Sequence, residues 1–298
     1  MAVTEFGPAA GAPVVVLHGF TGSAQAVAPL AERLAASLTA RIICPDLVGH
    51  GQSDTPDDPG LYRVEAMAGQ VASLAGALGC EPFHLVGYSM GGRVALTLGC
   101  AASRRLRSLT LIGASAGIAD PEQRRRRART DAARAERILA DFETFVDEWM
   151  ADPLFAGQIG LGEAHLRSAR AQRLASNPQG LARSLLAGGT AAMEPLHERL
   201  GACDVSTRLL VGVYDTKFCA IADELVSRLP RAGVARIDGA GHAAHVEQPE
   251  ATADAIVEFI AGTEDLLARS SAPPTTTAAL SELTAATAAR RDGEGDGG

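Results

Sequence analysis

The chain has 298 residues, of which 27 are basic and 35 acidic, so its formal net charge is −8. Apolar residues make up 47% and charged residues 21%, the range of globular proteins. The acidic balance argues against nucleic acid or an anionic membrane surface as a partner. The N-terminus lacks the basic and long apolar regions of a signal peptide, and no stretch approaches the roughly 18 apolar residues of a membrane helix. We therefore expect a cytoplasmic protein without membrane insertion.

The five cysteines predict neither a disulfide framework nor a metal site. Their number is odd, and no two have the spacing of metal ligands. The sequence contains no HExxH motif and no GxGxxG motif, so neither a catalytic metal nor a dinucleotide is indicated. We expect reduced thiols, no metal and no cofactor.

Short apolar runs alternate with segments of helical periodicity, a pattern typical of a mainly parallel sheet flanked by helices. In chain order, the predicted elements are strand Pro13–His18, helix Gln25–Leu38, strand Arg41–Pro45, helix Val64–Leu78, strand Phe83–Gly87, helix Gly91–Cys100 and strand Leu106–Gly113. After an interruption the alternation resumes with strand Thr207–Val213, helix Ala220–Leu229, strand Val234–Ile237 and helix Pro249–Ala261. The sequence therefore predicts the fold class α/β.

The interruption, residues 118–201, has no strand signal. Asp120–Pro121 predicts an N-cap followed by proline in the first turn of a helix. Further helices are expected through Glu143–Met150 and Leu166–Leu186. We interpret residues 118–201 as a helical lid inserted into a core formed by residues 1–117 and 202–262. Ser270–Thr277 is rich in Ser, Pro and Thr, and the chain ends in RRDGEGDGG, so residues 263–298 are predicted to form a disordered tail.

The segment Gly87-Tyr88-Ser89-Met90-Gly91 fits the nucleophile elbow, a tight turn from strand to helix that exposes a serine. Glycine is needed two residues before and after the serine because larger side chains would collide there. A second match surrounds Ser115, but no helix follows it at once, so we interpret Ser115 as a strand-end loop residue near the pocket. A nucleophile elbow within this alternation predicts the α/β-hydrolase fold, with a mainly parallel central sheet.

In this fold the serine is followed along the chain by an acid and then by a histidine, each on a loop after a strand. Asp215 directly follows the first strand beyond the lid, and His242 directly follows the next strand. His245 is the one serious rival of His242. The predicted catalytic triad is therefore Ser89, Asp215 and His242.

Two backbone N–H groups are expected to form an oxyanion hole. One is that of Phe20, in the His18-Gly19-Phe20 turn after the first strong strand, and the other is that of Met90, next to the nucleophile. Such donors stabilise negative charge that develops on an oxygen in the transition state.

Arginines gather in the lid, with seven of them between Arg124 and Arg137, and Arg93 follows Ser89 by about one helical turn. Most of the seven can lie on a solvated helix face. Arginine also binds carboxylates in a bidentate manner and remains charged, so the pattern suits a small polycarboxylate substrate.

Several of these segments resemble the family of 2-succinyl-6-hydroxy-2,4-cyclohexadiene-1-carboxylate (SHCHC) synthases of menaquinone biosynthesis. The resemblance extends from residue 14 to about 260. Its segments are VLHGFTGS (16–23), DLVGHGQSD (46–54), LVGYSMGGRVAL (85–96), EQRRRRARTD (122–131), Trp149 with PLF, Arg173 with SNPQGL (176–181), YDTKF (214–218) and GHAAHVEQP (241–249). The chain departs from many family members at Gly189–Met193, where they carry GTGxQ.

The resemblance implies an enzyme, a carbon–oxygen lyase that eliminates pyruvate from an enolpyruvyl substrate to form SHCHC. It also implies that Arg93, Arg127 and Arg173 hold substrate carboxylates. Tyr88, Trp149 and Phe155 would line the pocket. No cofactor is implied, and nothing in the sequence indicates an oligomeric state.

Two other functions are compatible with the motifs. One is an α/β-hydrolase that cleaves an ester, thioester or C–C bond of a small carboxylated substrate, since the triad serves that chemistry equally well. The other is a non-enzymatic binding protein, against which the intact triad argues.

Overall fold

The computed structural model describes residues 1–271. Its sheet has seven strands: β1 (Val3–Phe6), β2 (Pro13–Leu17), β3 (Arg41–Pro45), β4 (Phe83–Tyr88), β5 (Leu106–Ile112), β6 (Thr207–Gly212) and β7 (Ala232–Ile237). Six of these were predicted from the sequence with boundaries that agree within about two residues. The short strand β1 was not predicted, because four residues are too few for a clear periodic signal.

The strands lie in the order β1-β3-β2-β4-β5-β6-β7, and only β1 runs antiparallel to its neighbour. The nucleophile strand β4 is at the centre, between β2 and β5. In β2, Val15 and Leu17 pack in one core cluster while Val14 and Val16 pack in the other. This alternation means that both faces of the sheet are covered, which is why the parallel strands read as continuous apolar runs.

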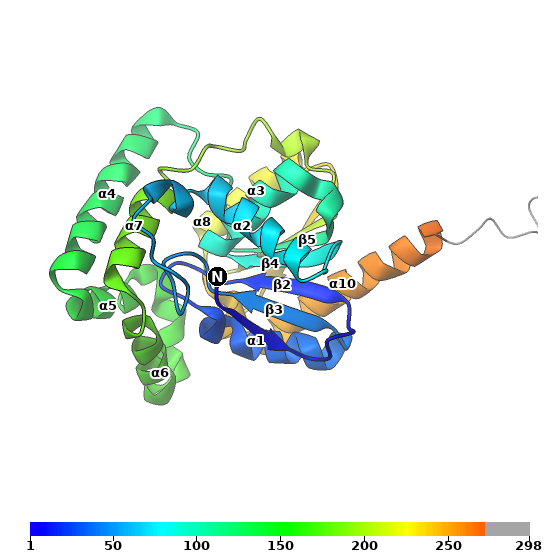
Figure 1. Cartoon of the computed structure of the whole chain (residues 1–298), viewed down its shortest axis with the longest axis horizontal. Helices are drawn as coiled ribbons and strands as arrows, with labels where there is room; N and C mark the ends of the chain where they lie inside the picture. The colour runs from blue at the N-terminus through cyan, green and yellow to red at the C-terminus, as the bar shows by residue number, and fades with distance from the viewer. Residues whose placement is uncertain (272–298) are drawn as a thin grey trace, which may run out of the picture. The chain divides into compact units, whose positions relative to one another are not determined.

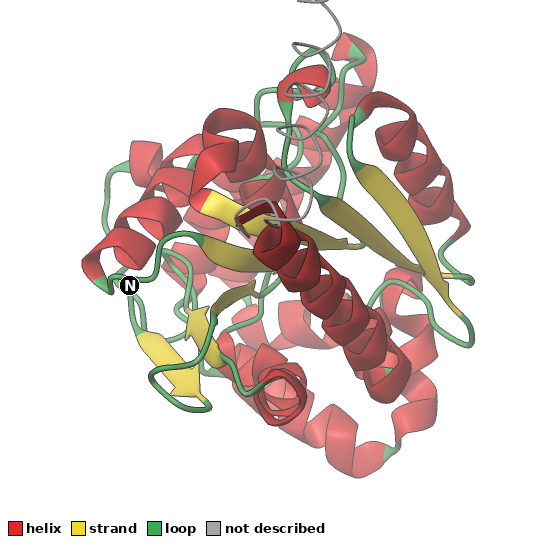
Figure 2. Ribbon diagram, turned by 90° about the vertical axis from the view of Figure 1, so that its right-hand side faces the viewer, coloured by secondary structure: helices red, strands yellow, loops and turns green. Residues whose placement is uncertain are grey.

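Helices cover the two faces of the sheet (Figures 1 and 2). The helices of the core are α1 (Ala24–Leu38), α2 (Val64–Ala77), α3 (Met90–Ala102), α8 (Thr216–Arg228), α9 (Ala244–Glu247) and α10 (Pro249–Ser271), with short 3₁₀ turns η1 (Pro59–Tyr62) and η2 (Ser103–Arg105). Met67 of α2, Val94 of α3 and Leu225 of α8 pack on one face. Leu34 of α1 and Ile256 of α10 pack on the other.

The segment between β5 and β6 contains no strand, as the sequence predicts. It holds α4 (Pro121–Ala140), α5 (Phe142–Met150), η3 (Pro153–Leu161), α6 (Glu163–Leu174), α7 (Pro178–Gly188) and the turn η4 (Leu200–Ala202). Asp120 caps α4 by accepting a hydrogen bond from the N–H of Gln123. The predicted helical run Leu166–Leu186 is divided in two, because Asn177 caps a new helix and Pro178 starts it.

The lid helices have a small apolar core of their own. Ala135 and Ile138 of α4, Phe145 and Val146 of α5, and Leu181 of α7 meet in this core. In Figure 1 the lid helices lie to one side of the sheet. Residues of α4, α5, α6 and α7 line one cavity together with Ser89 of the predicted elbow.

Residues 1–260 form one compact unit. The last helix, α10, continues to Ser271, so the prediction of a disordered tail from residue 263 was wrong for residues 263–271. The sequence TEDLLARS has good helix formers throughout, and no proline or glycine stops the helix before residue 272. The rest of the predicted tail, residues 272–298, lies outside the described residues.

Candidate active site

The nucleophile elbow lies between β4 and α3. Ser89 has φ 50° and ψ −105°, a strained conformation for a residue with a side chain. A Cβ added at Gly87 would lie 2.5 Å from the carbonyl oxygen of Gly91, and one added at Gly91 would lie 2.5 Å from that of His18. The two glycines are therefore required by the close approach of neighbouring backbone. Ser115, in the second match to the motif, lies in a loop that lines the pocket, as predicted.

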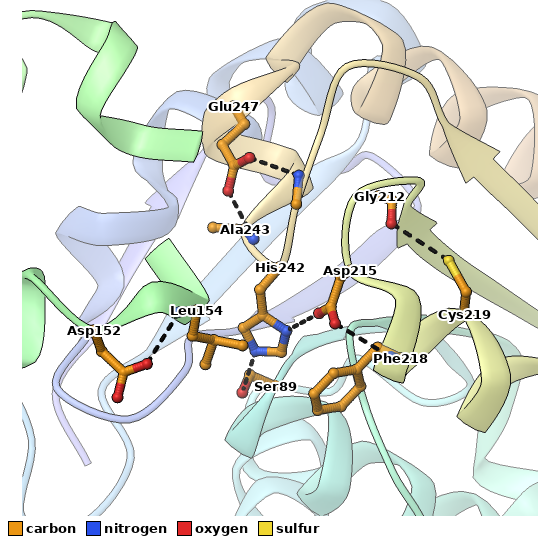
Figure 3. A network of polar contacts seen from close by, with 11 residues as sticks. Ser89, Asp152, Leu154, Gly212, Asp215, Phe218, Cys219, His242, Ala243 and Glu247 are labelled. Atoms are coloured by element: carbon orange, nitrogen blue, oxygen red, sulfur yellow. Dashed lines mark hydrogen bonds and ion pairs between the residues drawn. The ribbon is translucent and has the colours of Figure 1, made fainter. Parts of the chain in front are cut away.

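Three loops bring Ser89, Asp215 and His242 together (Figure 3). The Nε2 atom of His242 lies 3.1 Å from the Ser89 hydroxyl, and its Nδ1 atom lies 2.8 Å from Oδ2 of Asp215. Asp215 also accepts a hydrogen bond of 3.2 Å from the N–H of Phe218 and so caps α8. With Nδ1–H donating to the carboxylate, Nε2 is left to accept the serine proton.

His245, the rival base, has a different environment. Its ring packs against that of Tyr88 at a tilt of 55°, with 4.3 Å between ring centroids, and burial lowers its pKa to about 3. It therefore stays neutral at physiological pH. It lines the pocket wall, and the histidine hydrogen-bonded to Ser89 is His242.

The two predicted oxyanion-hole residues come from the start of α3 and from the turn after β2. Met90 is the first residue of α3, so its N–H has no partner within the helix. Phe20 follows the turn at His18, whose buried ring bonds to the Gly19 carbonyl (2.8 Å) and accepts from the N–H of Leu47 (3.0 Å). His18 therefore holds the turn in place, and burial lowers its pKa so that it remains neutral.

A cavity of about 830 Å³ opens above the triad, between the sheet and the lid. Every side chain predicted to bind substrate lines it: Tyr88, Arg93, Arg127, Trp149, Phe155 and Arg173. Ser89, His242, Phe20 and Met90 line the same cavity. Tertiary packing thus brings residues from both halves of the core and from four lid elements to one space.

The three arginines differ in their pairing. The guanidinium of Arg93 is buried and donates to the carbonyl of Gly188 (2.7 Å), and burial lowers its pKa to about 10. Arg173 donates to the carbonyl of Ala169 (2.9 Å), while its buried Nε has no partner in the described part of the chain. Of the three, Arg127 is the one that forms an ion pair within the described residues, with Asp131 (2.7 Å).

Aromatic rings form the apolar part of the cavity. Trp149 packs edge-on to Phe20 (5.5 Å between centroids) and to Phe155 (5.5 Å). Phe155 lies 6.4 Å from the His242 ring, and burial raises the pKa of Tyr88 above its usual value. The indole N–H of Trp149 is buried without a partner among the described residues, so it is available to a ligand in the cavity.

Several lining residues were not assigned a role from the sequence. Lys217 lies in the YDTKF segment (214–218) and lines the cavity. Its position two residues after the predicted triad acid Asp215 could have identified it from the sequence. His165 of α6 also lines the cavity, and its buried Nε2 lacks a partner in the described chain. Arg134 lies over Trp149, 5.2 Å from the ring centroid. No sequence signal separates Arg134 from the other six arginines of its helix.

Residues 1–271 contain no group of three or more His, Cys, Asp or Glu side chains arranged to hold a metal ion. The five cysteines are all unpaired, and Cys100 and Cys219 are only partly buried. None of the helices in the described chain combines the length and apolar character that crossing a bilayer demands.

Comparisons with known proteins identify relatives that match most of the chain. The alpha/beta hydrolase family model matches residues 14–255. A Bacillus subtilis protein provisionally named 2-succinyl-6-hydroxy-2,4-cyclohexadiene-1-carboxylate synthase is 37% identical over 260 residues, which cover 87% of this chain and 94% of that protein. The synthase of this name from Klebsiella pneumoniae is 32% identical over 252 residues, covering 83% of this chain and 93% of its own.

Solved structures show the same relationship. MenH from S. aureus superimposes with a TM-score of 0.81 at 28% identity, covering 88% of this chain and 98% of that chain. A thermophilic esterase from Thermogutta terrifontis, solved with malate bound, has a TM-score of 0.73 at 30% identity and covers 88% and 93% of the two chains. From its fold and its full-length relatives, we conclude that the chain belongs to the α/β-hydrolase family and, within it, to the SHCHC synthases.

Proposed function

We propose that this enzyme acts in menaquinone biosynthesis and eliminates pyruvate from 2-succinyl-5-enolpyruvyl-6-hydroxy-3-cyclohexene-1-carboxylate to give SHCHC. The observation that carries the proposal is the cavity, which combines a hydrogen-bonded Ser–His–Asp triad with three arginine side chains. The names of the relatives support the same reaction.

In the proposed mechanism His242 accepts the hydroxyl proton of Ser89, and the resulting alkoxide removes a proton from the substrate ring. Asp215 holds the imidazole in the required tautomer and stabilises the imidazolium. Electrons move through the ring system, and the C–O bond to the enolpyruvyl group breaks. The proton on His242 is then available to the departing enolpyruvate, which becomes pyruvate. The step consumes no water and forms no acyl-enzyme.

Negative charge develops on the succinyl carbonyl oxygen during proton removal. The N–H groups of Phe20 and Met90 would stabilise this enolate oxygen as they would a tetrahedral intermediate in an esterase. The loss of one such donor typically costs about 2.7–4 kcal/mol of transition-state stabilisation. The same two N–H donors can therefore support an elimination reaction, and no additional catalytic group is needed to stabilise the enolate.

The substrate carries three carboxylates, and the cavity offers Arg93, Arg127 and Arg173 to bind them. A charge-assisted hydrogen bond contributes about 1.5–3 kcal/mol when it is shielded from water. The aromatic side chains of Tyr88, Trp149 and Phe155 would pack against the ring and exclude water.

The test is direct. The enolpyruvyl substrate is generated in situ by the preceding enzyme of the pathway, and the release of pyruvate is measured with and without this protein. We expect release well above the spontaneous rate, and a loss of about 10³-fold or more in kcat for Ser89→Ala. Release at the spontaneous rate by folded wild-type protein would refute the proposal.

Ester hydrolysis is the second candidate, and the 30% identity to an esterase structure favours it. Its triad and oxyanion hole would be the same. A neutral ester gives no reason for buried arginines to line the cavity, so charge on the substrate distinguishes the two reactions. Efficient turnover of neutral esters together with no pyruvate release would favour the hydrolase.

A further inference from the structure

We propose that Glu247 is a positioning residue for the catalytic base His242, and that the lid segment η3 holds the Glu247 carboxylate in place. The inference rests on the triad of the proposed function, but it does not depend on the identity of the substrate. It assigns a role to a buried carboxylate that the mechanism above does not use.

Glu247 is the last residue of α9, and its side chain turns back toward the loop that carries His242 (Figure 3). Its Oε2 atom accepts a hydrogen bond of 2.6 Å from the N–H of Gly241. Its Oε1 atom accepts one of 3.2 Å from the N–H of Ala243. These two residues flank His242, so one carboxylate binds the backbone on both sides of the base.

The carboxylate is buried, and Glu247 as a whole is 8% exposed. A buried N–H without a partner is unfavourable, so the two N–H groups fix the loop to this one side chain. Asp215 fixes the orientation of the His242 ring, at Nδ1. Glu247 fixes the backbone from which the ring extends. Asp215 and Glu247 together therefore position Nε2 of His242 at 3.1 Å from the Ser89 hydroxyl, one through the ring and the other through the backbone.

The lid reaches the same carboxylate. A Cβ added at Gly157 of η3 would lie 2.0 Å from Oε2 of Glu247 and 2.6 Å from its Cδ. The backbone of η3 therefore lies directly against the carboxylate and leaves it no room on that side. Two residues earlier, Phe155 lies 6.4 Å from the His242 ring. The lid segment thus contacts both the base and the carboxylate that holds the base.

This arrangement predicts a catalytic effect distinct from a loss of stability. Glutamine has nearly the shape of glutamate, but it has one acceptor oxygen and would direct an NH₂ group at one of the two N–H donors. The loop must then shift, and displacements of about 1 Å at a catalytic group reduce rates by about 10²-fold. The substrate-binding arginines are not moved, so KM is expected to change little.

The first experiment compares Glu247→Gln with Glu258→Gln, a matched change at an exposed position of α10. The readouts are kcat and KM for pyruvate release, and the second-order rate of Ser89 labelling by a fluorophosphonate. For Glu247→Gln we expect kcat and the labelling rate to fall about 10- to 100-fold with KM within about two-fold. Glu258→Gln is expected to match wild type. Labelling of Glu247→Gln at the wild-type rate would overturn the proposal.

The fluorophosphonate readout separates this inference from the proposed function. If wild-type protein releases no pyruvate but is labelled at Ser89, the proposed reaction is wrong, while the role of Glu247 is still decided by the labelling rates. A rise in KM with kcat and labelling unchanged would assign Glu247 to substrate binding and would also overturn the proposal.

The second experiment changes the lid segment η3 instead of Glu247, so it tests the proposal even if Glu247→Gln fails to fold. Gly157→Ala places a methyl group against the carboxylate, whereas Gly160→Ala, in the same segment, meets nothing within 4 Å. We expect about a 10-fold lower labelling rate for Gly157→Ala and no change for Gly160→Ala. Where Glu247→Gln folds, the double variant Glu247→Gln/Gly157→Ala can also be measured. Its labelling rate should fall by less than the product of the two single-variant factors, because both changes act through one carboxylate. Equal rates for the two alanine variants would show that the lid does not hold Glu247.

Discussion

Arg127 donates a hydrogen bond of 2.7 Å from its Nε to Oδ1 of Asp131, one turn further along α4. The side chain of Asp131 is 4% exposed, and its Oδ2 has no partner among the described residues. Arg127 therefore has two tasks: it neutralises a buried carboxylate, and it presents the rest of its guanidinium to the cavity. A substrate carboxylate that binds Arg127 must share the guanidinium group with Asp131.

Arg127→Ala is expected to lower stability as well as activity, because it removes the hydrogen-bonded ion-pair partner of the buried Asp131 carboxylate. We expect a loss of about 1–3 kcal/mol in the free energy of unfolding and a clearly lower kcat/KM. Urea titration and steady-state kinetics measure the two effects. The control is Arg126→Ala on the same helix, where the arginine is 73% exposed and should contribute little to either. Equal stability of the two variants would mean that Asp131 is satisfied without Arg127.

Arg173→Ala tests whether the cavity selects charged substrates. The arginine side chain is partly buried, and its Nε has no protein partner in the described chain, so we assign it to a substrate carboxylate. We expect kcat/KM for pyruvate release to fall about 10- to 100-fold, the equivalent of one shielded charge-assisted hydrogen bond. Any residual hydrolysis of a small neutral ester should change by less than about three-fold.

Arg167→Ala is the matched control for this experiment, since Arg167 lies on the same helix, is 72% exposed and, within residues 1–271, forms an ion pair only with Glu163. If Arg173→Ala lowered kcat/KM equally for the charged and the neutral substrate, Arg173 would maintain the lid structure instead of binding a carboxylate.

Lys217 can be tested by chemistry that no other side chain confounds, because it is the only lysine in the chain. It lines the cavity and lies in the first turn of α8, where the helix dipole disfavours a cation. We expect Lys217→Ala to raise KM about 3- to 10-fold, as for one partly exposed ionic contact. Acetylation of wild-type protein by an amine-specific reagent should have the same effect and should be slowed by substrate. Lys217→Ala treated with the reagent controls for the α-amino group.

The buried histidines predict how stability depends on pH. Burial lowers the pKa of His50 and of His245 to about 3, whereas in the unfolded chain each titrates near 6.5. Between these values the unfolded state binds more protons, so stability is complete above pH 6.5 and falls as the pH is lowered toward 3. Each histidine should remove about 2 kcal/mol between pH 7.5 and pH 5.

Urea unfolding at the two pH values measures this slope. In His50→Gln the free energy of unfolding should depend less steeply on pH, because glutamine does not titrate. The stability of each protein at pH 7.5 serves as its reference. A slope that is unchanged in His50→Gln would mean that another group binds the protons.

The local pattern of the sequence was sufficient for the fold and the triad. Six strands, the elbow at Ser89 and the loop positions of Asp215 and His242 follow from short-range periodicity and from the steric demands of a tight turn. These features are encoded within a few residues of each site. The length of α10 was predicted incorrectly because helix propensity continues where the composition already suggested a tail.

The tertiary structure decided which charged residues matter. Arg127 and Arg126 are neighbours in the sequence, yet packing of α4 directs one to the cavity with Asp131 and the other to solvent with Glu122. Glu247 in the GHAAHVEQP segment has no distinguishing sequence signal, and its two hydrogen bonds around His242 exist only once α9 folds back. Such roles depend on contacts between distant segments and on burial, which a linear pattern of residues does not specify.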